Sequence, residues 1–98
     1  MSANTLDSAI VLFTGKGEFN FPHQSAERVR DRFPGREGVE LAARVEALET
    51  EFYMVKPRTD ETLVDAANRA AQTFAGHHPE LSSEAVAALR WCFAFDWK

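Results

Sequence analysis

The clearest pattern in the chain is a stripe of apolar residues between Glu37 and Val55. Its members recur at steps of four, three, four and three residues, which places them on one side of an α-helix. They are Leu41, Val45, Leu48, Phe52 and Val55. The sequence therefore predicts a long amphipathic helix over residues 37–55, with the stripe buried. We expect the helix to end before Pro57, because proline disfavours helical backbone in the residue that precedes it.

Two weaker patterns predict helices on either side of the long one. Residues 25–33 place apolar side chains at helical spacing behind Ser25, which can serve as the N-cap. A further helix is expected to start at Thr59 or Asp60 and to end at Gly76, since glycine often ends a helix. The apolar stripe of this further helix consists of Leu63, Ala67, Ala70 and Phe74.

The N-terminal region is typical of a β-hairpin. Residues 9–14 form an apolar run with β-branched and aromatic side chains, and glycines at positions 15 and 17 follow it. Phe19 and Phe21 then alternate with polar residues, as a strand does. The glycines can supply the positive φ angles of a tight turn. We expect a hairpin over residues 9–21; the alternative is a short apolar helix that ends at Gly15.

The C-terminal segment predicts a helix that begins after Ser82. Ser82 can cap it, and Leu81 and Val86 are spaced as a hydrophobic staple. Beyond residue 90, four aromatic residues alternate with other residues: Trp91, Phe93, Phe95 and Trp97. Such alternation indicates a strand, but no glycine or proline stops the helix before Lys98. We therefore favour a helix through this segment and keep a C-terminal strand as the alternative.

Together these elements predict a mainly α fold, with three or four helices and a short N-terminal β-hairpin. The alternatives are an all-α bundle and an α+β fold with a C-terminal strand. The 98 residues fit a single small globular domain over 1–98, because domains are typically roughly 50–250 residues long. Neither a repeat nor a long linker divides the sequence.

The charge balance argues against one class of function. The chain carries 11 Lys and Arg residues against 15 Asp and Glu residues, which gives a net charge of −4. Non-specific nucleic-acid binders usually carry a basic excess that neutralises phosphates, so this small acidic protein is not expected to bind nucleic acid. The first apolar run is too short for a signal peptide or a membrane span. We therefore expect a cytoplasmic protein with no membrane contact.

No catalytic or metal-binding pattern stands out. His77 and His78 share a polar turn, but adjacent histidines rarely reach one ion, and no HExxH or CxxC spacing is present. The Gly-Lys-Gly turn at 15–17 lacks the rest of a phosphate-binding loop. The single cysteine, Cys92, lies in an aromatic run, where burial raises the thiol pKa and makes the thiol inert. We expect no catalytic residues, no cofactor and no metal, and we favour a non-enzyme.

The C-terminal aromatics supply the main candidates for an interface. In a helix, Phe93 continues the core stripe, whereas Trp91 and Phe95 lie off it. Exposed aromatic patches mark binding surfaces, and Trp is enriched among binding hot spots. Trp91, Phe95 and Trp97 are therefore candidate interface residues. The alternative is that the whole run supplies core.

A second candidate surface is basic. Arg28 and Arg32 lie one helical turn apart in the segment 25–33 and share a face, while Glu27 and Asp31 interrupt the positive field. The simplest interpretation is a solvated helix face, and the alternative is contact with an acidic partner. Arg28 and Arg32 are therefore also candidate interface residues.

These signals favour a non-catalytic protein–protein interaction module, or a small regulatory or neutralising partner protein. The expected partner is another protein or a second copy of the chain, which would make it a homodimer. One alternative is a DNA-associated regulator, in which helical segments at 60–75 and from 83 onward form a helix-turn-helix-like unit. A further alternative is a small ligand-binding domain or enzyme.

Overall fold

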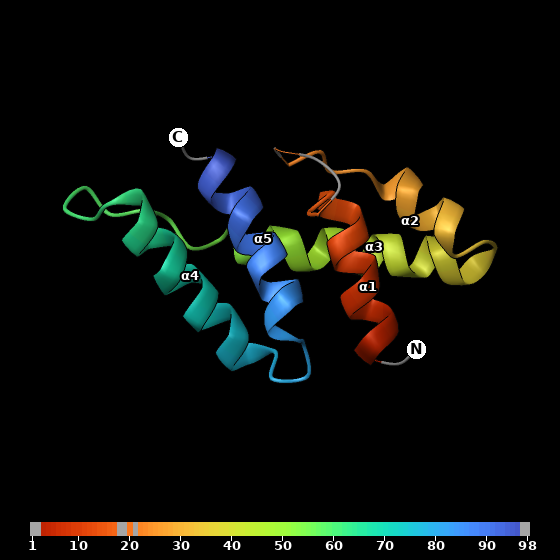
Figure 1. Ribbon diagram of the computed structural model, residues 1–98. Helices are drawn as coiled ribbons and strands as arrows, with labels where there is room; N and C mark the ends of the chain where they lie inside the picture. The colour runs from red at the N-terminus through yellow and green to blue at the C-terminus, as the bar shows by residue number, and fades with distance from the viewer. Residues whose placement is uncertain (1–2, 18–19, 21, 97–98) are drawn as a thin grey trace.

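The computed structural model describes residues 3–17, 20 and 22–96. Over these residues the chain forms five α-helices and no strand (Figure 1). The helices are α1 (Ala3–Thr14), α2 (Ala26–Arg32), α3 (Arg36–Phe52), α4 (Leu63–His77) and α5 (Ser83–Asp96). The prediction of a mainly α fold is confirmed, but the described helices number five rather than three or four.

The helices are arranged in two layers. Helices α1 and α5 run in the same direction across α3, and α4 runs antiparallel to α5 (Figure 1). Helix α2 folds back along α3. The principal extents of the molecule are 46 × 27 × 19 Å, and the smallest of them matches two layers of helices packed about 8–10 Å apart. One broad face of this flat molecule is therefore formed by α4, α5 and α1.

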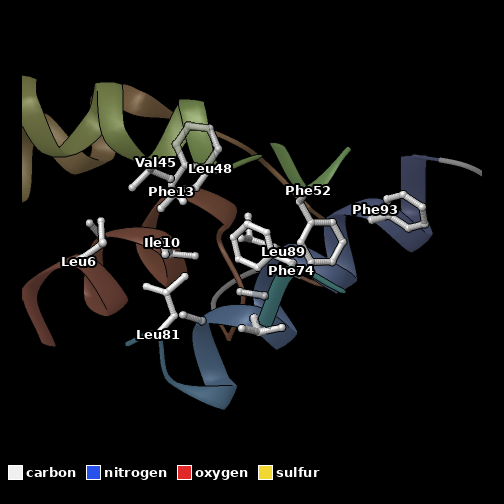
Figure 2. Close-up of a cluster of buried hydrophobic side chains, with 14 of the residues drawn as sticks. Leu6, Ile10, Phe13, Val45, Leu48, Phe52, Phe74, Leu81, Leu89 and Phe93 are labelled. Carbon is white, nitrogen blue, oxygen red and sulfur yellow. The ribbon is translucent and has the colours of Figure 1, made fainter. Parts of the chain in front are cut away.

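All five helices contribute to one hydrophobic core, part of which is shown in Figure 2. The stripe predicted for the long helix is buried from Leu41 to Phe52, while Val55 lies beyond the helix end and is partly buried. The centroid of the Phe52 ring lies 5.1 Å from that of Phe74 on α4 and 5.7 Å from that of Phe93 on α5. Helix α3 therefore joins α4 and α5 through a cluster of aromatic rings.

The predicted N-terminal hairpin over residues 9–21 is wrong, because residues 9–14 belong to helix α1. Leu6, Ile10 and Phe13 recur at helical steps of four and three residues and are all buried. A pattern read from residue 9 onward omits Leu6, without which the helical period is hard to see. Phe19 and Phe21, the expected second strand, lie outside the described residues.

Helix α1 ends at Thr14, directly before Gly15, in agreement with the alternative interpretation of this segment. The backbone φ of Gly15 is +81°, a left-handed conformation that favours glycine. The N–H of Gly15 donates a hydrogen bond to the carbonyl of Val11 at 3.1 Å, and the Thr14 hydroxyl donates to the same carbonyl at 2.9 Å. The glycine that suggests a hairpin turn therefore closes a helix.

The helix predicted over residues 25–33 is confirmed as α2. The Ser25 hydroxyl accepts a hydrogen bond from the Arg28 N–H at 3.3 Å and so caps the helix as expected. The long helix α3 follows closely and ends at Phe52, three residues before the predicted position. A Cβ added to Gly38 on α3 would lie 1.8 Å from the carbonyl oxygen of Phe33. The close approach of α2 and α3 therefore requires glycine at this position.

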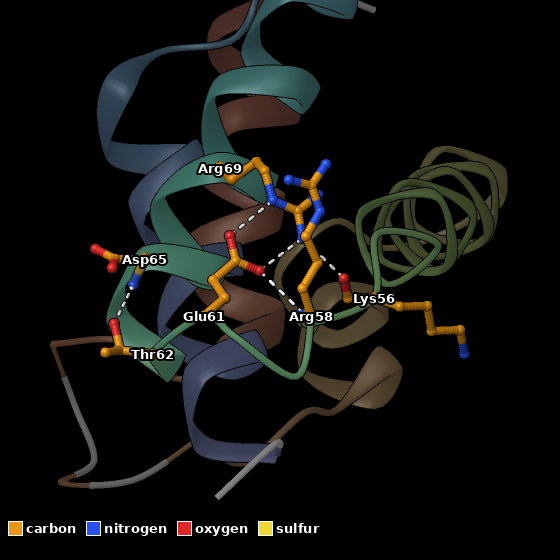
Figure 3. A network of polar contacts seen from close by, with 6 residues as sticks. All are labelled: Lys56, Arg58, Glu61, Thr62, Asp65 and Arg69. Atoms are coloured by element: carbon orange, nitrogen blue, oxygen red, sulfur yellow. Dashed lines mark hydrogen bonds and ion pairs between the residues drawn. The ribbon is translucent and has the colours of Figure 1, made fainter.

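Helix α4 begins later than predicted, at Leu63 instead of Thr59 or Asp60. The N-cap is Thr62, whose hydroxyl accepts a hydrogen bond from the Asp65 N–H at 3.1 Å (Figure 3). Both threonines suit a cap by residue type alone. Contacts between the intervening segment and distant residues determine that Thr62, and not Thr59, is the N-cap.

A hydrogen-bonded network around Glu61 holds the segment that precedes α4 (Figure 3). The Glu61 carboxylate accepts hydrogen bonds from the Arg69 guanidinium, at 2.8 Å on each oxygen, and from the Arg58 N–H at 3.1 Å. The hydrogen bond from Arg69 lowers the pKa of the Glu61 carboxyl to about 2. Arg69 also donates to the carbonyl of Lys56 at 2.8 Å. These contacts hold residues 58–61 in a turn, and α4 therefore does not extend into this segment.

Helix α4 continues through Gly76 to His77 rather than ending at the glycine. His78 closes it, because its N–H donates to the carbonyl of Phe74 at 3.0 Å. The His78 ring lies 4.6 Å from the Phe74 ring, and its Nε2 lies 2.6 Å from a carboxylate oxygen of Glu51 on α3. The end of α4 is therefore fixed by tertiary contacts of His78.

Candidate interaction surface

Helix α5 extends to Asp96, so residues 91–96 are helical and the alternative of a C-terminal strand is wrong for them. The predicted start is confirmed, because the Ser82 hydroxyl accepts a hydrogen bond from the Ala85 N–H at 3.2 Å. Leu81 and Val86, the predicted staple, are each only 9% exposed. The C-terminal aromatics therefore project from a single helix.

Helix α5 has an inner and an outer face. The inner face packs into the core and includes Leu89, Cys92 and Phe93, which have no exposed surface. The outer face consists of residues that are exposed or half-buried: Ser83, Glu84, Ala87, Arg90, Trp91, Ala94 and Phe95. Phe95 is 41% exposed. Trp97, the third candidate aromatic, lies outside the described residues.

An apolar groove lies between α4 and the C-terminal half of α5. The groove has a volume of about 370 Å³ and is lined by Asn20, Leu63, Val64, Arg90, Trp91, Ala94 and Phe95. Val64 is 60% exposed. Single exposed apolar side chains are ordinary on protein surfaces, but several that line one groove are typical of a binding site. We call this the aromatic groove.

A second groove lies between the C-terminal end of α4 and the N-terminal half of α5. Its volume is about 420 Å³, and its lining is Ala75, His78, Pro79, Leu81, Ser83, Val86, Ala87 and Arg90. Its α5 side carries the small side chains of Ser83 and Ala87, so we call it the small-residue groove. Arg90 lines both grooves, which therefore adjoin along the seam between α4 and α5.

Arg90 is the cation at the junction of the two grooves. Its Nε donates a hydrogen bond to the side-chain oxygen of Asn68 on α4 at 2.9 Å. Within the described part of the chain this is its one hydrogen bond, so its two terminal nitrogens are available to an acidic group. No acidic residue among those described lines either groove.

Of the two candidate arginines, Arg28 has an intramolecular role. Its guanidinium donates to the carbonyls of Leu12 and Phe13 at 3.0 and 2.9 Å, and also to the carbonyl of His23. The last carbonyls of a helix lack partners within the helix. Arg28 therefore ties α2 to the end of α1.

Arg32 is exposed, and its guanidinium carbon lies 5.1 Å from the centroid of the Phe33 ring. It lines a separate groove between α1 and α2, together with Thr5, Ser8, Leu12 and Phe33. Helix α2 and helix α4 lie at opposite ends of the molecule (Figure 1). The structure thus brings Trp91 and Phe95 together in one groove, but it does not bring Arg28 and Arg32 to them.

Four titratable side chains gather where α5 ends beside α3. The Tyr53 hydroxyl donates a hydrogen bond to Asp96, and burial together with this bond raises the pKa of Tyr53 well above its usual value. Burial raises the pKa of the Glu49 carboxyl. Burial, with repulsion from Glu49 and Asp96, raises the pKa of the Cys92 thiol to about 12. The predicted burial of Cys92 and the predicted rise of its thiol pKa are both found, and they favour the thiol over the reactive thiolate.

In the histidine-rich turn, His78 contacts two carboxylates. His78 Nε2 contacts Glu51, and its Nδ1 lies 3.7 Å from a carboxylate oxygen of Glu80. Cys92 lies on the inner face of α5 and is buried. Over the described ranges, no three His, Cys, Asp or Glu side chains are placed to share a metal ion.

Sequence reasoning identifies the aromatic residues of this surface but misses Val64 and Arg90. Val64 lies one position off the predicted stripe of α4, and Arg90 is an isolated cation in an apolar segment. One signal was available, because Ser83, Ala87, Trp91 and Phe95 recur at steps of four and form a row along the helix. That row marks the outer face of α5.

No helix within the described residues is both long and apolar enough to cross a bilayer. No protein-family model matches the chain, and no curated protein or solved structure matches it. The outer face of α5 and its two grooves are therefore the candidate site in this chain.

Proposed function

We propose that this chain is a non-catalytic protein–protein interaction module that binds its partner through the outer face of α5 and the two adjoining grooves. One observation carries the proposal: Val64 and Phe95, which are 60% and 41% exposed, line the same groove as Trp91. Covering this apolar surface with a partner is favourable, at about 25 cal/mol for each Å² removed from water.

The chemistry of the grooves also supports binding to a protein. Apolar surface with a few polar groups at its edge is the usual anatomy of an interface, and Trp and Arg are frequent hot-spot residues. Nucleophilic or acid–base catalysis needs titratable groups that reach a substrate. Cys92 is instead buried on the inner face of α5, and one carboxylate oxygen of Glu49 on α3 is buried as well.

The arrangement of α4 and α5 gives no specific support to the alternative of a DNA-associated regulator. The two helices lie side by side as an antiparallel pair (Figure 1). In a helix-turn-helix the helices cross at about 90–120°. We therefore advance only the interaction module.

Site-specific photocrosslinking tests this proposal. A photoreactive amino acid replaces Trp91 in the full chain, and irradiation takes place in the cells that produce the protein. The matched control carries the same amino acid at Ala43, an exposed position on α3. We expect a discrete covalent adduct from position 91 and none from position 43, followed by binding of the identified partner in purified form.

The purified partner then provides the decisive comparison. Because a hot spot contributes about 2 kcal/mol or more, Phe95→Ser should weaken its binding about thirtyfold while leaving the circular dichroism spectrum unchanged. Equal crosslinking from positions 91 and 43, or unchanged affinity for Phe95→Ser, would contradict the proposed function.

A further inference from the structure

We infer that the partner on the outer face of α5 is a second copy of this chain, paired around a two-fold axis at Ala87. This inference rests on the proposed function, since it uses the same surface. It identifies the partner, and it states which residues of the two α5 helices face each other. Three features of the surface carry it: a small residue at its centre, complementary charges around that residue, and bulky side chains opposite small ones.

Ala87 lies at the middle of the outer face. It is half-buried and belongs to the row formed by Ser83, Ala87, Trp91 and Phe95. Helices pack with their axes about 8–10 Å apart, and the smaller distances need small side chains at the crossing point. A pair of α5 helices can therefore approach most closely at Ala87.

Charges of opposite sign flank Ala87 at equal distances along the helix. Glu84 lies three residues before Ala87 and Arg90 lies three residues after it. In an antiparallel pair centred at Ala87, Arg90 of each copy comes level with Glu84 of the other. Neither residue forms an ion pair within the described part of the chain. The two-fold pairing would bring Arg90 of each copy to Glu84 of the other, which gives two ion pairs.

The two halves of the surface also differ in side-chain size. Trp91 and Ser83 lie four residues on either side of Ala87 on α5, and Phe95 lies one turn beyond Trp91. The antiparallel pairing therefore places the aromatic groove of each copy beside the small-residue groove of the other. The small-residue groove, about 420 Å³ in volume, offers space for these aromatic side chains.

The charge distribution explains how an acidic chain can pair with itself. The net charge of −4 opposes random association of two copies. The described residues that line the two grooves include one cation, Arg90, and no carboxylate. With Glu84 added, the outer face of α5 is neutral. The repulsion between two copies is therefore smallest when this face forms the contact.

Charge reversal tests the register directly. Sedimentation equilibrium of the full chain across a dilution series measures the dimer dissociation constant. Arg90→Glu and Glu84→Arg should each weaken dimerisation at least tenfold, because each places like charges opposite one another. The double variant should restore a dissociation constant close to that of the wild type. Arg44→Glu on the exposed side of α3 is the control for net charge and should leave dimerisation unchanged.

The results separate this inference from the proposed function. A wild-type chain that is monomeric across the series overturns the pairing, as does a double variant no tighter than the weaker single variant. If the chain is monomeric and position 91 nevertheless crosslinks to a different protein, the interaction module stands and the second copy is excluded. If the chain is monomeric and position 91 yields no specific adduct, both proposals fail. Circular dichroism of every variant confirms that it is folded.

Discussion

Phe93 and Phe95 lie two residues apart on helix α5, yet Phe93 is completely buried and Phe95 is 41% exposed. The Phe93 ring packs edge-on against Tyr53, with centroids 5.8 Å apart, and contacts Phe52 in the same way. Phe95 instead lines the aromatic groove with Trp91 and Val64. Identical side chains therefore have different roles, because a two-residue step turns a helix by about 200°.

The comparison extends to the two faces as a whole. The inner face of α5 is buried against α1 and α3, and its side chains supply the core. The outer face has no described helix packed over it and carries the grooves. Changes on the inner face should therefore alter folding, and changes on the outer face should alter association.

The largest effect is expected from Phe93→Ala. Removing a fully buried phenylalanine costs about 3–5 kcal/mol, because apolar contacts are lost and a cavity remains. The free energy of unfolding, measured by urea denaturation, should fall by this amount. Phe95→Ala is the matched control and should cost less than about 1 kcal/mol. Equal losses for the two variants would show that the faces are not distinct.

Leu48→Ala tests the part of the core that α3 contributes beneath the α1–α5 layer. Leu48 is 1% exposed and lies in the buried cluster of Figure 2. The substitution should destabilise the fold by about 2–5 kcal/mol in the same urea experiment. Ala47, the next residue along the chain, is exposed, and Ala47→Ser should change stability by less than about 0.5 kcal/mol. A Leu48→Ala variant that melts like the wild type would contradict the burial of this stripe.

Trp91→Ala should show the opposite balance from Phe93→Ala. Trp91 is half-buried on the outer face, so its truncation should weaken association about thirtyfold, the effect of a hot spot of about 2 kcal/mol. The free energy of unfolding of the monomer should change by less than about 1 kcal/mol. Val39→Ala removes an apolar side chain that is 57% exposed on α3 and should leave association unchanged.

Glu49→Gln should produce the smallest effect, and that effect should depend on pH. Burial raises the pKa of Glu49 above its ordinary value of 4.5, and Oε2 is buried with no hydrogen-bond partner among the described residues. The folded state therefore binds the proton more tightly than the unfolded state does, and ionisation at neutral pH costs stability. The variant should be more stable than the wild type at pH 7.

The same linkage fixes how the difference changes with pH. The cost of ionising Glu49 is present above its raised pKa and disappears as the pH falls to 4.5 and below. Thermal melts at pH 7 and at lower pH should show the advantage of Glu49→Gln shrinking. Asp60→Asn, at an exposed position in the turn before α4, controls for the lost charge. An advantage that grows on acidification would have the wrong sign.

The sequence predicts those parts of the fold that local periodicity determines. The α3 stripe and the Ser25 and Ser82 caps are visible because each depends on residues within one or two helical turns. The start of α4 is not visible. It depends on Arg69 reaching Glu61 and the carbonyl of Lys56, contacts that span 8 and 13 residues. A rule based on residue type alone cannot choose between Thr59 and Thr62 as the N-cap, because these contacts of Arg69 determine where the helix starts.

The N-terminal region and the candidate surface show the same limit in different ways. Gly15 suits both a hairpin turn and a helix end, and the buried Leu6 resolves the choice only when the helical period is followed from it. The aromatic residues of α5 are evident in the sequence. The grooves are not, because they require Val64 on one helix to lie beside Trp91 on another.

Disulfide formation by Ala87→Cys probes the two-fold pairing of α5 at its centre. Helix axes about 8–10 Å apart, less the Cα radius of about 2.3 Å on each side, leave Cα atoms about 3.4–5.4 Å apart at a two-fold crossing. A disulfide needs a similar separation. Ala43→Cys on α3 is the control, and the buried Cys92 is present in both variants.

Both variants are oxidised with glutathione disulfide and separated on a non-reducing gel. We expect rapid formation of a covalent dimer by Ala87→Cys, slow formation by Ala43→Cys, and loss of the rapid reaction when Arg90→Glu is added. Equal rates for positions 87 and 43, or a rate at position 87 that Arg90→Glu does not change, would contradict a two-fold interface on the outer face of α5.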